Sequence, residues 1–340
     1  MGNVSAAELS KSASDLPSPP LLPPSPPTDI PKKIKVKETS GSAGVPPVEV
    51  DVNPGLYEDL HKQTKELFPQ VFEGAKVIVA KGLSSHFQIS HTITLSTFTP
   101  SVYRFGTTYI GTKQISPTES FPVLLGDIDS SGNMNANIIH AINQRIRAKL
   151  VAQFQPNKCV GHQVSLDYKG DDFTASLTTG NVDPLSSSGL LVAHYLQRIT
   201  PSLALGAEIM YQRGQQVPGG EIAIMSLAGR WSGDKWQLSA NLSPMAGNLH
   251  TCFYQKVNDT LQVGVELETS IRMAESTATV AYQIDIPKAD VVFRGQLDSN
   301  WCIGAVIEKK LAPFPFTLAL SGYGNHVKSQ YRFGIGMIIG

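Results

Sequence analysis

The residues that come closest to a metal-binding or phosphate-binding motif are the histidines and one glycine pattern. His86 and His91 could serve a metal, but residues five apart in an extended strand point to opposite faces, so the two cannot chelate one ion. Gly334-Ile335-Gly336 has the spacing of a phosphate-binding loop, yet no helix follows it before Gly340, so we expect no phosphate site there. Five further histidines show no ligand-type spacing: His140, His162, His194, His250 and His326.

The sequence also lacks the common motifs for nucleophilic and redox chemistry. Neither a G-x-S-x-G motif for a serine nucleophile nor an H-E-x-x-H motif for a catalytic zinc occurs. The three cysteines, Cys159, Cys252 and Cys302, are far apart and include no C-x-x-C pair, which favours reduced thiols over a disulfide framework. We therefore expect a protein that is not an enzyme and that uses no cofactor and no metal.

The composition narrows the class of protein further. The 340 residues suit one large domain with a tail, and 28 Lys and Arg balance 28 Asp and Glu, so the chain lacks the positive charge of a nucleic-acid binder. No run of 18 apolar residues occurs, which excludes a transmembrane helix. The sequence is still compatible with membrane-spanning β-strands, because each needs only about 10 residues that alternate between apolar and polar.

The first 52 residues form a proline-rich block. Eleven of the 23 prolines lie within the first 54 positions, and seven of these lie between Pro17 and Pro27. Since proline fixes φ and lacks an N–H, residues 1–52 are predicted to be an extended, disordered tail. A solvated spacer is the favoured role, and a proline-rich docking ligand is the alternative.

A short amphipathic helix is predicted in the next segment, 53–73. Asn53 is a suitable N-cap, and Pro54 suits the first helical position. Leu56, Leu60 and Leu67 follow at spacings of four and seven, which places them on one stripe of a helix. The predicted helix covers about 54–68, or about four turns.

From about residue 74 to 340 the hydrophobic pattern has a period of two, which is typical of β-strands. Leu261–Glu268 alternates without a fault, and turn formers such as Lys169-Gly170-Asp171-Asp172 separate such runs. The pattern predicts about seventeen strands of about ten residues each, and two further, less regular strands at 121–128 and 134–141.

This number of strands predicts the architecture. Open twisted sheets rarely exceed about ten strands, whereas closure into one ring removes both edges of the sheet. A ring this wide cannot be filled by side chains, so its interior is expected to be polar and wet. We predict an all-β fold in which 74–340 forms a transmembrane β-barrel.

Charged residues indicate which face of each strand meets water. In the run from Arg145 to Phe154 the bases share one face and the apolar residues the other. A Lys or Arg facing lipid at the bilayer midplane costs about 2–4 kcal/mol, so the charged face is predicted to line the lumen. For any one charge, an ordinary position near the wet end of a strand is the alternative. The predicted pore-lining acids are Asp167, Glu208, Glu266, Glu268, Asp285, Asp298 and Glu308. The predicted pore-lining bases are Arg147, Lys149 and Arg294.

Four longer stretches, at 111–119, 190–201, 298–301 and 308–311, carry a resemblance to a known family. Through them the chain resembles the channel-forming subunits of the translocase of the outer mitochondrial membrane (the TOM complex), within the mitochondrial porin superfamily. The last strand also fits the β-signal of that family, with polar, glycine and two hydrophobic positions at Arg332, Gly334, Met337 and Ile339.

The resemblance implies nineteen strands closed by parallel pairing of the first and last, with the 54–68 helix inside the lumen. It implies a channel in the mitochondrial outer membrane that imports unfolded precursor proteins. The implied partners are receptor subunits, small single-helix subunits, a second copy of the channel, the precursors themselves and membrane lipid.

Two other functions stay open at this stage. A metabolite or ion pore of the same fold would be expected to have a basic lumen and an anion preference. A soluble β-rich binding or scaffold protein would be released from membranes by alkaline carbonate, whereas a barrel would be retained.

Overall fold

The structure, a computed structural model, describes residues 53–97, 100–116, 119–156, 158–183, 187–214, 217 and 219–340. The predicted proline-rich tail, 1–52, lies outside these residues. The described residues belong to one compact unit, Glu49–Gly340.

Nineteen strands make up almost all of this unit and form a single sheet. Their bounds are β1 Gly74–Gly82, β2 Phe87–Leu95, β3 Val102–Ser116, β4 Glu119–Asp129, β5 Met134–Ala141, β6 Ile146–Gln155, β7 Lys158–Lys169, β8 Phe173–Asp183, β9 Ser188–Arg198, β10 Leu203–Arg213, β11 Glu221–Ser232, β12 Trp236–Ser243, β13 Asn248–Lys256, β14 Leu261–Ser270, β15 Glu275–Ile286, β16 Val291–Asp298, β17 Cys302–Lys310, β18 Phe316–Asn325 and β19 Gln330–Ile339.

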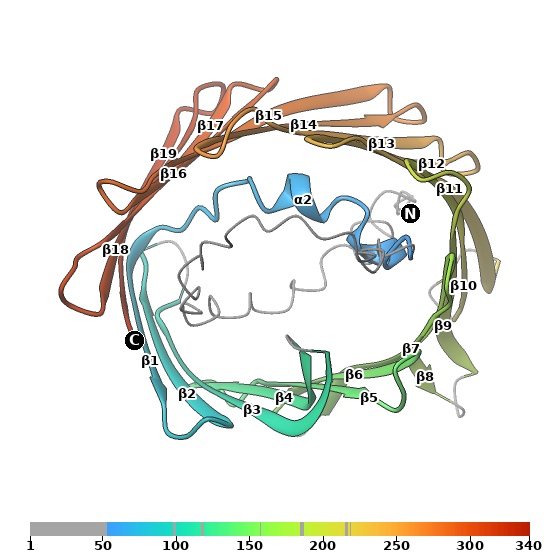
Figure 1. Ribbon diagram of the computed structural model, residues 1–340, viewed down its shortest axis with the longest axis horizontal. Coiled ribbons are helices and arrows are strands. Elements are labelled where there is room, and N and C mark those ends of the chain that lie inside the picture. The colour runs from blue at the N-terminus through green and yellow to red at the C-terminus, as the bar shows by residue number, and fades with distance from the viewer. Residues whose placement is uncertain are drawn as a thin grey trace, which may run out of the picture. The chain divides into compact units, whose positions relative to one another are not determined.

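The sheet closes on itself into a barrel (Figure 1). Each strand pairs antiparallel with the next along the chain, and β1 pairs parallel with β19, with Gly74 opposite Gly334 and Val79 opposite Ile339. The nineteen strands and the parallel closure confirm the expected fold. β4 and β5 also confirm the two less regular strands expected at 121–128 and 134–141.

The alternation of the strands puts apolar side chains on the outer surface. Val280 pairs with Leu297, and Leu297 pairs with Ile303, so the three form one row across β15, β16 and β17. Each of the three is 42–45% exposed. Such a row is costly in water and suits lipid contact. Among the described residues, no helix has the length and apolar character needed to cross a membrane.

The predicted four-turn helix at 54–68 is wrong in its extent. The segment contains only a 3-10 turn, η1 Tyr57–Asp59, and one helical turn, α2 Lys62–Lys65. Asn53 caps no helix, because its side chain bonds to the barrel wall, and Gly55 has a φ of +80°, which interrupts helical geometry. His61, with φ −100° and ψ 3°, separates the two turns. Contacts of this segment with the barrel wall override its local helical preference.

Candidate functional site

The segment 53–73, called the inner segment here, runs along the inside of the barrel wall (Figure 1). Its start is fixed by the Asn53 side chain. Asn53 Nδ2 donates hydrogen bonds to the carbonyl oxygens of Gly170 at 2.7 Å and Phe173 at 3.1 Å, and Oδ1 accepts one from Thr174 Oγ1 at 3.1 Å. Arg230 of β11 donates to the carbonyl oxygen of Pro54. The Asn53 amide thus donates two hydrogen bonds and accepts one, which only a side chain with both donor and acceptor groups can do.

The middle of the inner segment packs on β9 to β12. The Tyr57 ring stacks on the His194 ring with centroids 4.7 Å apart. Leu60 is 1% exposed and joins Tyr57 and Leu196 in a small apolar cluster. Gln237 Nε2 donates to the carbonyl oxygen of Leu60 at 3.0 Å. This stretch is therefore held by both apolar burial and satisfied polar groups.

The end of the inner segment lies on glycines of the wall. Thr64 and Leu67 pack on Gly264 of β14, and Phe72 packs on Gly334 and Gly336 of β19. The side chains of the segment occupy the space that a Cβ on the wall would need. Because these contacts are on the inside of the ring, they identify the inward-facing positions of each strand.

The predicted acids share those inward-facing positions. On β14, Gly264, Glu266 and Glu268 are two apart and therefore share a face. Register carries the same face to the remaining strands, as in Glu266 opposite Thr279 and Asp285 opposite Val292. The inward-facing acids found in this way are Asp167, Glu208, Glu266, Glu268, Asp285, Asp298 and Glu308.

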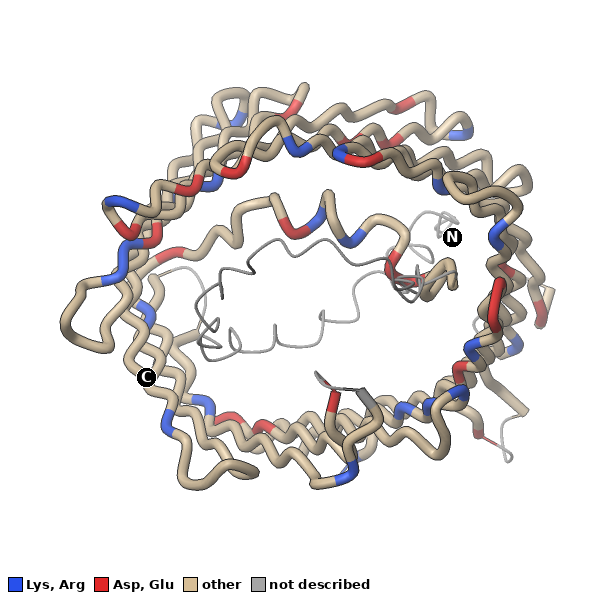
Figure 2. The backbone as a smooth tube through the Cα atoms, in the orientation of Figure 1, with Lys and Arg blue, Asp and Glu red and all other residues tan. Residues whose placement is uncertain are grey.

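The predicted bases share the inward face as well. Arg147 and Lys149 are two apart on β6, and Arg147 lines a cavity together with Leu56 and Asp59 of the inner segment. Arg294 is opposite Gln283 on β15, on the same face as Asp285. Figure 2 shows acidic and basic residues distributed around the ring and along the inner segment.

Several of the acids have close polar partners, which the sequence pattern did not indicate. Arg294 Nη1 lies 3.1 Å from Glu308 Oε1, and His194 Nε2 lies 2.8 Å from Glu208 Oε2. Asp298 accepts hydrogen bonds within its own turn, from Asn300 N and Ser299 Oγ. The Glu268 side chain is 66% exposed, and its carboxylate lies 3.9 Å from His250 Nε2. The inner surface is thus a mixture of paired and solvated charges.

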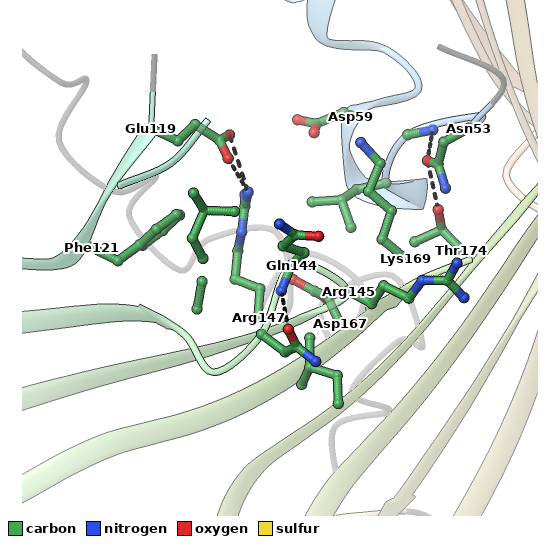
Figure 3. Close-up of a pocket in the computed structure, with 16 residues that line it drawn as sticks. Asn53, Asp59, Glu119, Phe121, Gln144, Arg145, Arg147, Asp167, Lys169 and Thr174 are labelled. Carbon is green, nitrogen blue, oxygen red and sulfur yellow. Dashed lines mark hydrogen bonds and ion pairs between the residues drawn. The ribbon is translucent and has the colours of Figure 1, made fainter. Parts of the chain in front are cut away.

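A cavity of about 210 Å³ lies between the start of the inner segment and β3 to β8 (Figure 3). Arg147 Nη2 lies 3.1 Å from Glu119 Oε2 at one side of it, and Asn53 bonds to Thr174 at the other. Leu56, predicted on one stripe with Leu60 and Leu67, lines this cavity and is half-buried, whereas the other two are buried. The three therefore do not share one surface.

The β-signal positions lie on β19 at the closure of the barrel. Met337 and Ile339 are paired with Val77 and Val79 of β1. Arg332 Nε lies 3.6 Å from Glu73 Oε2, so this strand also meets the end of the inner segment.

The comparisons with known proteins agree with this architecture. The eukaryotic porin family matches residues 53–334. A curated relative, "Mitochondrial import receptor subunit TOM40 homolog 2" of Drosophila melanogaster, is 52% identical over 310 residues, covering 88% of this chain and 91% of that protein. The chain belongs to the eukaryotic porin family, in its TOM40 group.

Other TOM40-group members give the same result. The TOM40 homolog of Homo sapiens is 51% identical, with 85% of this chain and 78% of that protein covered. The TOM40 homolog of Caenorhabditis elegans is 46% identical, with 85% and 95% covered. The family resemblance read from the longer sequence stretches is confirmed.

Two overlapping groups of potential metal ligands in the described part of this porin-family barrel were not predicted from the sequence: His61 with His250 and Cys252, and His250 with Glu266 and Glu268. His61, His250 and Cys252 each offer a ligand atom, and these atoms lie within 4.8 Å of one another. The signal in the sequence was His250-x-Cys252, because two residues two apart on a strand share a face. His61 could not be placed beside them without the path of the inner segment.

Proposed function

We propose that this protein is a protein-conducting channel of the mitochondrial outer membrane, through which unfolded precursor proteins pass. The observation that carries the proposal is the closed nineteen-strand ring with an apolar outer row and charged inward-facing positions, in a chain about half identical to proteins named mitochondrial import receptor subunit TOM40. The mechanism involves no catalytic step, in keeping with a porin fold. The metabolite or ion pore is the rival function.

The inward-facing charges are proposed to line the path of the precursor. Mitochondrial targeting segments are rich in arginine and poor in acids. Glu266 and Glu268 lie two apart on β14, and Asp285 follows on the neighbouring β15. At physiological salt the Debye length is about 8 Å, so such acids attract a basic segment only when it is close to the wall. Weak, reversible attraction favours passage over retention.

The proposed organisation assigns 53–73 to the pore and 74–340 to the transmembrane barrel, and the predicted proline-rich tail, 1–52, lies outside the described residues. The proposed partners are receptor subunits and small single-helix subunits of a TOM complex, a second copy of the channel, membrane lipid and the precursors. No nucleic acid is among them, since the chain has no net charge.

Reconstitution into planar bilayers separates the two functions. A protein-conducting channel is expected to prefer cations and to be blocked by a basic presequence peptide added to one side. Anion preference without peptide block would support the metabolite pore instead. Retention in membranes after alkaline carbonate extraction is the accompanying test of membrane insertion.

The role of the acids needs a separate test. The triple variant Glu266→Gln, Glu268→Gln, Asp285→Asn should slow import of strongly basic precursors at low salt, with a smaller effect at high salt. Asp259→Asn is the matched control, because Asp259 is an acid in an exposed turn, paired with Lys256. Equal import by the triple variant and the control would rule out the acidic path while leaving the channel function intact.

A further inference from the structure

A cluster of metal-ligand side chains lies where the inner segment meets β13 and β14. His250 and Cys252 occupy neighbouring inward positions of β13, and His61 reaches them from the inner segment. The His61 and His250 rings are 4.3 Å apart, centroid to centroid. The cluster thus joins two parts of the chain that local sequence does not connect.

Cys252, His250 and Glu266 of the wall lie close enough together to approach one ion. Cys252 is fully buried, and its Sγ lies 3.4 Å from His250 Nε2. Glu266 is directly opposite Cys252 in the ladder, and its Oε1 lies 3.8 Å from Cys252 Sγ and 2.6 Å from His250 Nε2. Ligand atoms about 2.0–2.3 Å from a tetrahedral zinc ion lie roughly 3.3–3.8 Å from one another. The two distances from Cys252 Sγ are close to this range, whereas the hydrogen bond between His250 and Glu266 is shorter and has to open when both bind the ion.

His61 has one ring nitrogen that is free to bind an ion. One ring nitrogen, Nδ1, lies 2.9 Å from Ser239 Oγ, whereas Nε2 is buried with no hydrogen-bond partner in the described part of the chain. An imidazole nitrogen can offer a lone pair to a metal, and the contact of the other ring nitrogen with the Ser239 hydroxyl holds the ring in place.

We propose that His61, His250, Cys252 and Glu266 bind one divalent cation of the zinc class, and that the bound ion fastens the inner segment to β13 and β14. Two imidazoles, a thiolate and a carboxylate form a donor set that selects Zn²⁺ over Ca²⁺ or Mg²⁺, which prefer oxygen ligands. On binding, the Cys252 S–H bond breaks, a sulfur–metal bond forms and the proton passes to the solvent. With four protein ligands the site is closed, which indicates a structural role rather than a catalytic one.

The proposed metal site rests on the distances between these side chains and does not depend on the proposed transport function. A hydrogen-bonded His–Glu–Cys cluster that binds no ion is the opposing interpretation. The pair of His194 and Glu208 serves as a comparison for these two interpretations. Its side chains make the same kind of contact, at 2.8 Å, and meet the inner segment through Tyr57, but the pair includes no cysteine.

The test uses the full-length protein, purified in detergent, stripped of metal and titrated with Zn²⁺ by calorimetry and with Co²⁺ by absorption spectroscopy. We expect one ion per chain and a thiolate-to-cobalt charge-transfer band. Losing an outer partner of a ligand typically weakens metal binding by about 10–100-fold, so Cys252→Ser and His61→Gln should weaken it at least as much. His194→Gln and Cys159→Ser are the matched controls and should bind as the unmodified protein does.

His61→Gln keeps the test valid if Cys252→Ser disturbs the barrel, because His61 lies outside the strands. A second measurement is trypsin cleavage after Lys62 and Lys65, which are exposed. Zn²⁺ should slow this cleavage in the unmodified protein and in His194→Gln, but not in His61→Gln. No binding by the unmodified protein, or equal binding by His61→Gln and the controls, would overturn the proposal.

Discussion

Gly264 on the inner wall lies directly against Leu67 of the inner segment. A Cβ at position 264 would lie 2.9 Å from Leu67 Cδ1 and 3.0 Å from Thr64 Cγ2, both closer than normal van der Waals contact. The inner segment and the wall therefore fit by shape at this point. Leu67 is 2% exposed, so the fit also buries apolar surface.

A side chain at position 264 should displace the inner segment without opening the barrel. In Gly264→Val the added methyl groups would occupy the place of Leu67, and the overlap is resolved most easily by movement of the segment, which has no strand pairing. We expect faster trypsin cleavage after Lys65 and unchanged strand content by circular dichroism.

Gly322→Val is the control for this experiment. A Cβ at Gly322 would lie 3.9 Å from its nearest neighbour, the Phe333 ring, so it fits without movement. Equal cleavage rates in Gly264→Val and Gly322→Val would show that the glycine contact does not hold the segment.

Leu60 should contribute more to docking of the inner segment than Leu56. Truncating a buried leucine costs about 2–5 kcal/mol, and Leu60 is 1% exposed, whereas Leu56 is half-buried beside the cavity. Leu60→Ala should therefore reduce hydrogen-exchange protection of the amides of α2 by well over tenfold, since about 1.4 kcal/mol corresponds to a factor of ten. Leu56→Ala should have a clearly smaller effect, and a reversed order would contradict this account of the packing.

Asn53 should tolerate neither alanine nor aspartate. Asn53→Ala removes hydrogen bonds to Gly170, Phe173 and Thr174. The Phe173 carbonyl keeps its bond from Gly170 N, but a polar group left unpaired at Gly170 or Thr174 costs about 1–3 kcal/mol. Asn53→Asp keeps the acceptor for Thr174 but places a carboxylate against two carbonyl oxygens. Both variants should raise protease sensitivity near residue 53, and Asn53→Asp should do so at least as strongly. Protection of Asn53→Asp at the level of the unmodified protein would mean that the two donated bonds contribute nothing.

The sequence predicted the wall much better than it predicted what lies against it. The alternation at Leu261–Glu268 is continuous, and β14 covers it fully, because one face of each strand meets lipid and the other meets water. The conformation of the inner segment is set by tertiary contacts instead. Its backbone is shaped by Asn53, Arg230 and glycines of distant strands, so local helical spacing at 54–68 was a poor guide.

The charged site could be predicted by face but not by partner. Alternation alone places Arg294 and Glu308 inward, since a charge facing lipid is costly. That they are 3.1 Å apart depends on the register of β16 against β17, which one chain does not reveal. The same holds for His61, whose contact with His250 follows from tertiary structure alone.

Arg294 and Glu308 provide a test of electrostatics in the lumen with two opposite signs. The side chains are 27% and 35% exposed, so the pair should add no more than about 1 kcal/mol to stability, and neutralising either residue should leave the barrel folded. Arg294→Gln leaves a carboxylate without its partner and should raise the cation preference of the channel. Glu308→Gln leaves a guanidinium and should lower that preference. The double variant should return it close to the original value, because the net charge of the wall is then unchanged. Reversal potentials in asymmetric KCl give all three values. Shifts of the same sign in both single variants would mean that these side chains do not face the conducting path.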